Sequence, residues 1–80
     1  MDTLKVKCQV NNGMFSNKVQ ATIQTGYGEV ETLVSKDFVQ NGKLVLKIDH
    51  ETDDDIYVFI PGDLVKGDRY VKVNKRITEV

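Results

Sequence analysis

The chain has 80 residues, of which 40% are hydrophobic and 29% are charged, and its formal net charge is −1. This length supports one small hydrophobic core, so we expect a single domain over residues 1–80. A net charge near zero excludes the overall basic character that is typical of nucleic-acid-binding proteins. No apolar run approaches the roughly 18 residues that a membrane-spanning helix needs, which argues against a membrane protein.

Apolar and polar residues alternate in several segments, beginning with Leu4, Val6, Cys8 and Val10. A period of two places successive side chains on opposite faces of a β-strand, which gives a half-buried sheet. The pattern predicts six strands with short connections. In chain order the predicted strands cover about residues 3–10, 18–25, 29–34, 43–50, 56–60 and 69–74.

Turn residues separate these strands. Asn11-Asn12-Gly13 ends the first one, because Asn and Gly tolerate the positive φ of tight turns. Gly26-Tyr27-Gly28 makes the next turn. The segment 35–42 has no alternation and predicts one helical turn, and the acidic loop 51–55 follows the fourth strand. The residues after position 74 predict another short turn.

A weak repeat occurs in the second half of the chain. Leu33–Val39 and Phe59–Val65 each combine the end of a strand with a Ser or Pro and an apolar pair. This repeat predicts a tight turn after each strand, with apolar residues that fold back over an open barrel end. Ser35 and Asn74 suit helix-capping positions, and Pro61 suits a first-turn position. The alternative is that any all-β chain repeats strand, turn and strand.

We therefore expect an all-β fold, in the form of a small six-stranded and partly open barrel of the SH3-like class. Closure of a sheet removes the exposed edges that invite aggregation, which suits a chain of this size. Two alternatives remain open. One is a five-stranded Greek-key barrel of the oligonucleotide-binding kind, and the other is a dimer of intertwined, swapped hairpins.

The single cysteine bears on the compartment. Cys8 lies on the apolar face of the first predicted strand, where it cannot form an internal disulfide. A lone buried thiol is typical of a reducing compartment. The N-terminal residues do not show the pattern of a secretory signal peptide. We therefore expect a cytoplasmic protein.

Residues that support catalysis are sparse. Nucleophilic catalysis needs an activated Ser, Cys or Thr beside a base. The single histidine, His50, can be matched only with Cys8, which is distant in the sequence, and nothing else supports that pair. One Cys and one His cannot form a zinc site, and no phosphate-binding glycine motif is present. We expect no enzymatic activity, no catalytic residues and no cofactor.

The acidic run from Asp49 to Asp55 resembles a calcium loop only in part. Its carboxylates alternate as calcium ligands do, but the sixth position is Asp54 rather than Gly and the twelfth is Ile60 rather than Glu. We expect a solvated hairpin loop and no metal site. Weak binding of divalent ions and an acidic recognition patch are the alternatives.

The fifth predicted strand carries the candidate binding surface. Ile56, Val58 and Ile60 take one face of this strand, which leaves Tyr57 and Phe59 on the other. Exposed aromatic side chains on the outer face of a sheet are typical of an interaction site. If the sixth strand pairs with the fifth, aromatic and basic residues join the same face. The candidate binding residues are Tyr57, Phe59, Tyr70, Lys72, Arg69 and Arg76.

This pattern favours a non-enzymatic interaction module that binds a protein partner, because tyrosine supplies large contact area at low entropic cost. Binding of single-stranded nucleic acid on the same face is the first alternative, with bases stacked on the aromatics and phosphates on Lys72, Arg69 and Lys75. The segment 29–63 counts against it, because its nine acids and three lysines give a net charge of −6. This charge would repel a phosphate chain unless the acids lie on the side of the protein opposite the aromatic face.

Two further interpretations stay open. A structural homo-oligomer could assemble through the edge strands of the sheet. The aromatic face could also be covered by the chain's own loops, for which Met14-Phe15 and Phe38-Val39 are the candidates. Met14-Phe15 could alternatively protrude as an anchor for a partner.

Overall fold

The computed structural model describes residues 2–12 and 17–78. In these residues, short antiparallel strands make up most of the chain. The elements are, in chain order, β1 (Thr3–Asn12), β2 (Lys18–Gln24), β3 (Glu29–Ser35), the 3₁₀ turn η1 (Lys36–Phe38), β4 (Val39–Gln40), β5 (Lys43–Glu51), β6 (Asp55–Phe59), β7 (Asp63–Lys66), β8 (Tyr70–Asn74) and α1 (Lys75–Thr78).

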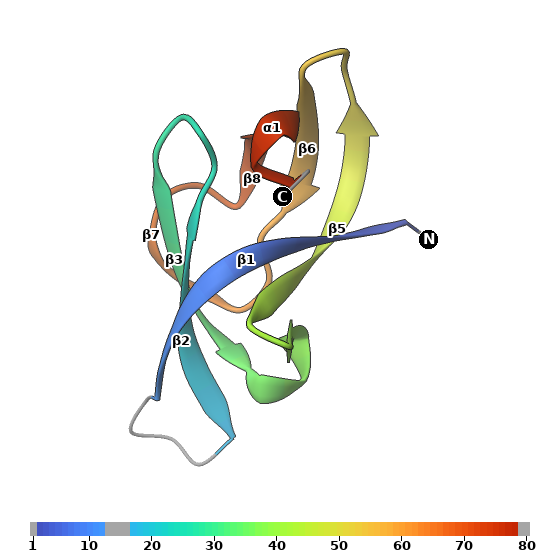
Figure 1. Cartoon of the computed structure of the whole chain (residues 1–80). Coiled ribbons are helices and arrows are strands. Elements are labelled where there is room, and N and C mark those ends of the chain that lie inside the picture. Colours follow the sequence, from blue (N-terminus) through green and yellow to red (C-terminus); the bar gives the residue numbers. More distant parts are fainter. Residues whose placement is uncertain (1, 13–16, 79–80) are drawn as a thin grey trace.

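The described strands form one antiparallel sheet in the order β7-β3-β2-β1-β5-β6-β8, and β4 pairs with β5. β1 joins the two halves of this sheet, because its first part pairs with β5 and its second part pairs with β2. Figure 1 shows β1 passing from β2, β3 and β7 to β5, β6 and β8, as the sheet curls into a half-barrel. The expected all-β, partly open barrel is confirmed, and its assignment to the SH3-like class stays a prediction.

The core lies inside the curl and comes from alternate strand positions. β2 and β3 both follow strict alternation of buried and half-buried residues, as a sheet with one face in the core requires. Each fully buried aliphatic side chain contributes about 1.5–3 kcal/mol of transfer free energy. The buried core residues are Val6, Val19, Ala21, Ile23, Val30, Val34, Leu44, Leu46, Ile56, Val58, Ile60 and Val73.

Hydrogen bonds also join the two halves of the sheet across the half-barrel. The backbone amide of Asn74 in β8 donates to the carbonyl of Thr25, which precedes β3, over 2.8 Å. The hydroxyl of Thr32 in β3 is 1% exposed and donates to the carbonyl of Pro61 over 2.6 Å. These bonds hold β8 and the β6–β7 connection against the half formed by β2 and β3.

The six predicted strands are present as β1, β2, β3, β5, β6 and β8. The helical turn predicted within 35–42 is η1, which the Ser35 hydroxyl caps by accepting a hydrogen bond from the Asp37 amide over 3.3 Å. Asn74 caps α1 in the same way, because its side-chain oxygen accepts from the Arg76 amide over 2.9 Å. Both capping predictions are therefore confirmed. The two-residue strand β4 was not expected from the pattern.

The prediction of a tight turn over the barrel end after Pro61 is wrong. Asp63–Lys66 instead forms strand β7, which pairs with β3 through a register shift at Glu31 and Thr32. The physical reason is the open edge of β3, since an extended segment beside it satisfies backbone groups that would otherwise lack partners. Gly62, with a φ of 80°, turns the chain toward that edge.

Two residues of the first strand depart from the expected interior position. Cys8 is half-buried at the margin of the core, and Val10 is 38% exposed. The pairing of β1 with β5 ends at Lys7, so the second half of β1 lacks that cover. The Cys8 thiol donates to the Gly42 carbonyl over 3.5 Å, and partial burial raises the pKa of the Cys8 thiol.

Strand β1 continues through Asn11 and Asn12, which pair with Gln20 and Val19, so it extends two residues beyond its predicted end at residue 10. The rest of the predicted first turn and Met14-Phe15 lie outside the described residues. Within 2–12 and 17–78, no helix has the length and apolar character needed to cross a bilayer.

Candidate interaction surface

The pairing of β6 with β8 brings four of the candidate residues together on the outer face of the half-barrel. Tyr57 lies opposite Lys72, and Phe59 lies opposite Tyr70. Both β6 aromatics are half-buried, whereas Tyr70 is 64% exposed. Period-two alternation in β6 sends Val58 into the core and the aromatic side chains outward.

Strand β5 adds a histidine to this face through a β-bulge. The register shifts between Ile48 and His50, so His50 lies opposite Tyr57. The two rings stack with centroids 4.3 Å apart and planes inclined by 11°. His50 Nδ1 also lies 2.7 Å from a carboxylate oxygen of Asp49, which orients the imidazole. A bulge re-aims side chains, and here it aligns a histidine with a tyrosine.

Arg69 and two rings form the second part of the surface. The rings of Phe59 and Tyr70 meet edge to face with centroids 5.3 Å apart. The Arg69 guanidinium carbon lies 5.5 Å from the centroid of the Phe59 ring. Nη1 of Arg69 donates to the carbonyls of Ile60 and Gly62 over 2.7 and 2.6 Å. The guanidinium is therefore anchored by the backbone, while its other N–H groups can serve a partner.

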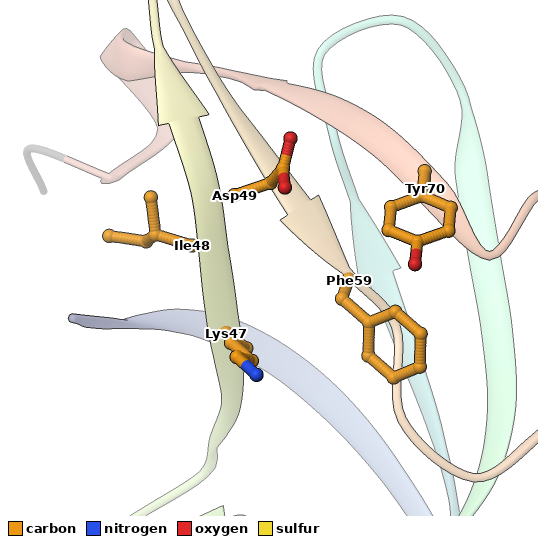
Figure 2. A pocket seen from close by; sticks show the side chains of 5 residues that line it. All are labelled: Lys47, Ile48, Asp49, Phe59 and Tyr70. Atoms are coloured by element: carbon orange, nitrogen blue, oxygen red, sulfur yellow. The ribbon is translucent and has the colours of Figure 1, made fainter. Parts of the chain in front are cut away.

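A shallow pocket of about 220 Å³ lies beside these rings. Figure 2 shows Phe59 from β6 and Tyr70 from β8 next to each other, with Lys47, Ile48 and Asp49 on neighbouring β5. The pocket is smaller than the 300–1,000 Å³ that sites for drug-sized ligands usually occupy. Its size and mixed lining suit one side chain of a partner better than a cofactor.

Tyr27 reaches this surface from the other half of the barrel. It lies in the turn between β2 and β3, where its hydroxyl donates to a carboxylate oxygen of Asp55 and accepts from the Asn74 side-chain amide over 3.2 Å. Lys72 Nζ lies 4.5 Å from the centroid of its ring. The Tyr27 side chain thus contacts residues of β6 and β8 and borders the surface. We call the group Tyr27, His50, Tyr57, Phe59 and Tyr70 the aromatic strip.

Five of the six residues predicted from the sequence lie together in or beside the β6–β8 part of the strip. The sixth, Arg76, lies on α1, outside the β6–β8 pairing, where it lines a hollow together with Tyr27. The residues predicted from the sequence do not include three members of this surface, Tyr27, His50 and Lys47. The outward position of Lys47 follows from alternation with Leu46 and Ile48. The contacts of Tyr27 and His50 depend on long-range packing and on a bulge, which no local pattern reveals.

The loop candidates for covering the strip take other positions. Val39 pairs with Leu44 in the β4–β5 ladder, and neighbouring Phe38 is itself 42% exposed. The strip therefore keeps Tyr70 and Tyr27 accessible, at 64% and 53% exposure. Met14-Phe15 lies outside the described residues.

The acidic residues after β5 form a hairpin tip. Asp53 and Asp54 are exposed there, and the Thr52 hydroxyl accepts a hydrogen bond from the Asp55 amide over 3.2 Å. Across the described part of the chain, no three His, Cys, Asp or Glu side chains converge as they would around a metal ion. The tip is a capped and solvated turn.

No protein-family model, curated protein or solved structure matches this chain significantly. Its function is therefore inferred from the chemistry of the surface itself.

Proposed function

We propose that this protein is a non-enzymatic interaction module that binds a protein partner through the aromatic strip. The observation that carries the proposal is the location of the rings. None of the aromatic side chains in the described residues belongs to the buried core, which is built from aliphatic residues. Aromatic residues usually dominate small cores because of their large apolar area. Their concentration on one outer face instead favours a contact role.

The composition of the strip suits a protein interface. Tyrosine and arginine are enriched among residues that dominate binding energy, and Arg69 is already anchored by two backbone carbonyls. Anchoring lowers the entropy that the side chain loses on binding. The pocket between Phe59 and Tyr70 offers a partner side chain an apolar wall beside Lys47.

The orientation of the rings favours protein over nucleic acid. A nucleobase needs a free aromatic face on which to stack. The Tyr57 ring already stacks on His50, and Arg69 lies over the Phe59 ring. Protein side chains can contact ring edges as well as faces, so they depend less on free faces.

Single-stranded nucleic acid remains the second candidate because of one observation. Several acids of the segment 29–63 lie away from the strip, with Glu29, Glu31 and Asp63 on the half formed by β3 and β7. The regional charge of −6 therefore does not oppose a phosphate chain on the strip as directly as it would if the acids lay there. A homo-oligomer through the four-residue edge strand β7 is a third possibility, and a cytoplasmic location stays a prediction.

Site-specific photo-crosslinking tests the proposal. A benzophenone amino acid replaces Tyr70 in one variant and exposed Lys36, on η1, in the control. After irradiation in cell extract, we expect an adduct with another protein at position 70 and not at position 36. A nucleic-acid adduct at position 70 would favour the second candidate, and a self-adduct would favour the homo-oligomer. Equal adducts at both positions, or none at all, would refute a docking role for the strip.

A further inference from the structure

We propose that the partner contributes an acidic polypeptide segment, held by a row of lysines that continues the aromatic strip across β5 and β1. This inference rests on the proposed function and specifies the partner's chemistry. The lysine row consists of Lys5 and Lys7 on β1 with Lys43 and Lys47 on β5. All four side chains are exposed on the outer face of the same curled sheet.

The pairing of β1 with β5 concentrates positive charge. Lys7 lies directly opposite Lys43, and Lys5 lies opposite Val45 between them and the strip. Within 2–12 and 17–78, none of the four lysines forms an ion pair with a carboxylate. Like charges that face each other across two strands destabilise a sheet. This arrangement does not stabilise the fold, whereas an anionic partner would relieve the repulsion between the lysines.

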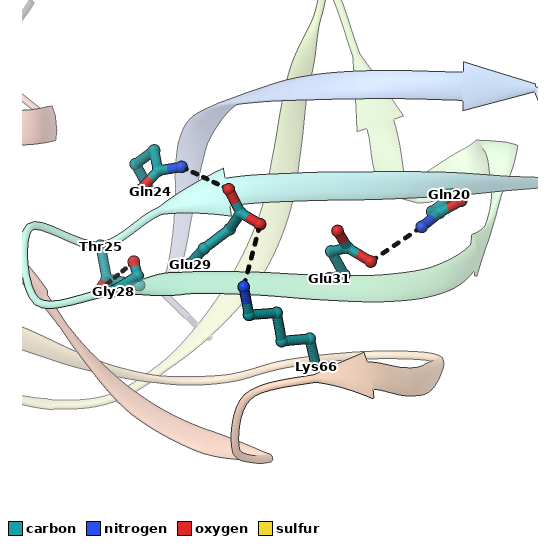
Figure 3. A network of polar contacts seen from close by, with 7 residues as sticks. All are labelled: Gln20, Gln24, Thr25, Gly28, Glu29, Glu31 and Lys66. Atoms are coloured by element: carbon teal, nitrogen blue, oxygen red, sulfur yellow. Dashed lines mark hydrogen bonds and ion pairs between the residues drawn. The ribbon is translucent and has the colours of Figure 1, made fainter.

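The other half of the barrel shows the contrast. Figure 3 shows the acids of β3 engaged by neighbouring side chains on the outer face. Glu29 accepts from Gln24 over 2.8 Å and pairs with Lys66 over 3.5 Å, and Glu31 accepts from Gln20 over 2.9 Å. Both acids of β3 therefore have side-chain partners, whereas the four lysines of the row have no carboxylate partner among the described residues.

The lysine row and the strip are continuous. Lys47 lies opposite Phe59 and lines the pocket beside it, and Arg69 and Lys72 border the strip on its far side. Adjacent strands are about 4.8 Å apart, so the distance from β1 to β8 is roughly 15 Å. About five extended residues cover this distance. A short segment could therefore place one side chain in the pocket and carboxylates on both sides of it.

The pocket distinguishes a polypeptide from a phosphate chain. Asp49 lines it together with Lys47, so a carboxylate meets any occupant at close range. A phosphate there would be repelled, whereas a peptide N–H can donate a hydrogen bond to the carboxylate. Arg69 also lies over the ring of Phe59, which lines the pocket, and this leaves fewer ring faces for bases.

Fluorescence anisotropy with two probes tests the inference. The first probe is a short fluorescein-labelled peptide of alternating Glu and Ser with a central Phe, and the second is an oligothymidylate of equal length. We expect the peptide to bind at low ionic strength and to weaken as salt is added, because exposed charges are screened. The double variant Lys5→Glu/Lys43→Glu should weaken peptide binding about tenfold. Lys36→Glu, on exposed η1, is the matched control and should leave binding unchanged.

The outcomes separate this inference from the proposed function. Tighter binding of the oligothymidylate, lost in the double variant, would replace the acidic segment with nucleic acid. Peptide binding that depends on Tyr70 but is unchanged in the double variant would overturn the inference and leave the docking role intact. Absence of peptide binding would overturn the inference as well, and crosslinking at position 70 would then decide the proposed function alone. Far-ultraviolet circular dichroism checks that each variant keeps the sheet.

Discussion

Lys7 and Lys43 face each other across two strands. Relieving their repulsion should raise the stability of the fold and weaken the binding of a partner. The two residues are directly paired across β1 and β5, and both side chains are exposed. The substitution Lys43→Glu replaces a repulsive cross-strand pair with an attractive one. We expect this variant to be more stable than the parent protein and to bind its partner less well.

The expected gain follows from the geometry of the pair. Residues directly opposite in an antiparallel ladder have Cβ atoms about 4.5–5.5 Å apart, and such charged pairs are worth roughly 0.2–1 kcal/mol. The substitution removes a repulsion and adds an attraction of similar size, and solvent screening of these exposed side chains limits the combined gain to about 0.5–1 kcal/mol. For a domain of this size, the melting temperature should rise by about 2–8 °C.

Thermal unfolding followed by circular dichroism at low and high salt is the assay. The gain should shrink in high salt, where the Debye length falls to about 3 Å. Lys36→Glu serves as the control, because Lys36 lies on η1 outside the β1–β5 ladder. A Lys43→Glu protein that melts at or below the parent's temperature at low salt would refute the claim that the lysine row costs stability.

Three other predictions concern the fold. Gly62→Ala should lower the free energy of unfolding by at least about 2 kcal/mol in urea titrations, since Gly62 has a φ of +80° and a Cβ there would lie 2.6 Å from Val34 Cγ1; an unchanged midpoint would contradict this. Thr32→Val should cost about 1–3 kcal/mol by leaving the buried Pro61 carbonyl without its hydroxyl donor, while Thr32→Ser should retain most of the stability; equal losses in both variants would point to packing instead. Because burial raises the pKa of the Cys8 thiol, the unfolded chain ionises first, so stability should fall as pH rises through the unfolded thiol's pKa. Cys8→Ala should lack that part of the decline, and identical profiles for the two proteins would count against the assigned cause.

The sequence allowed much of the sheet to be predicted because one face of most strands is buried. In β2, β3 and β6 the two-residue period follows burial closely, so polarity alone indicates the strands and their inward faces. The same argument places Tyr57 and Phe59 outward. Local turn chemistry was equally informative at Ser35 and Asn74, whose side chains bond backbone amides two residues later.

What could not be predicted depends on contacts between distant segments. Strand β7 has four residues, mostly exposed, and too short a pattern to show a period. Its extended conformation comes from the edge of β3. The hydrogen bonds of Tyr27 are also tertiary, since they join the β2–β3 turn to β6 and β8. The bulge before His50 lies within the β5–β6 hairpin, but the polarity pattern does not show where the register shifts. These features add Tyr27 and His50 to the aromatic strip. The sequence therefore predicts Tyr57, Phe59 and Tyr70 but not these two further members.

The most direct test of the docking surface is a map of the contact on the folded protein. Backbone amide chemical shifts of isotope-labelled protein, recorded with and without the partner captured at position 70, provide it. We expect the largest changes on the outer face of β5, β6 and β8, near Lys47, Phe59 and Tyr70, with weaker changes toward Lys5. Changes confined to β2, β3 and β7 would contradict the account.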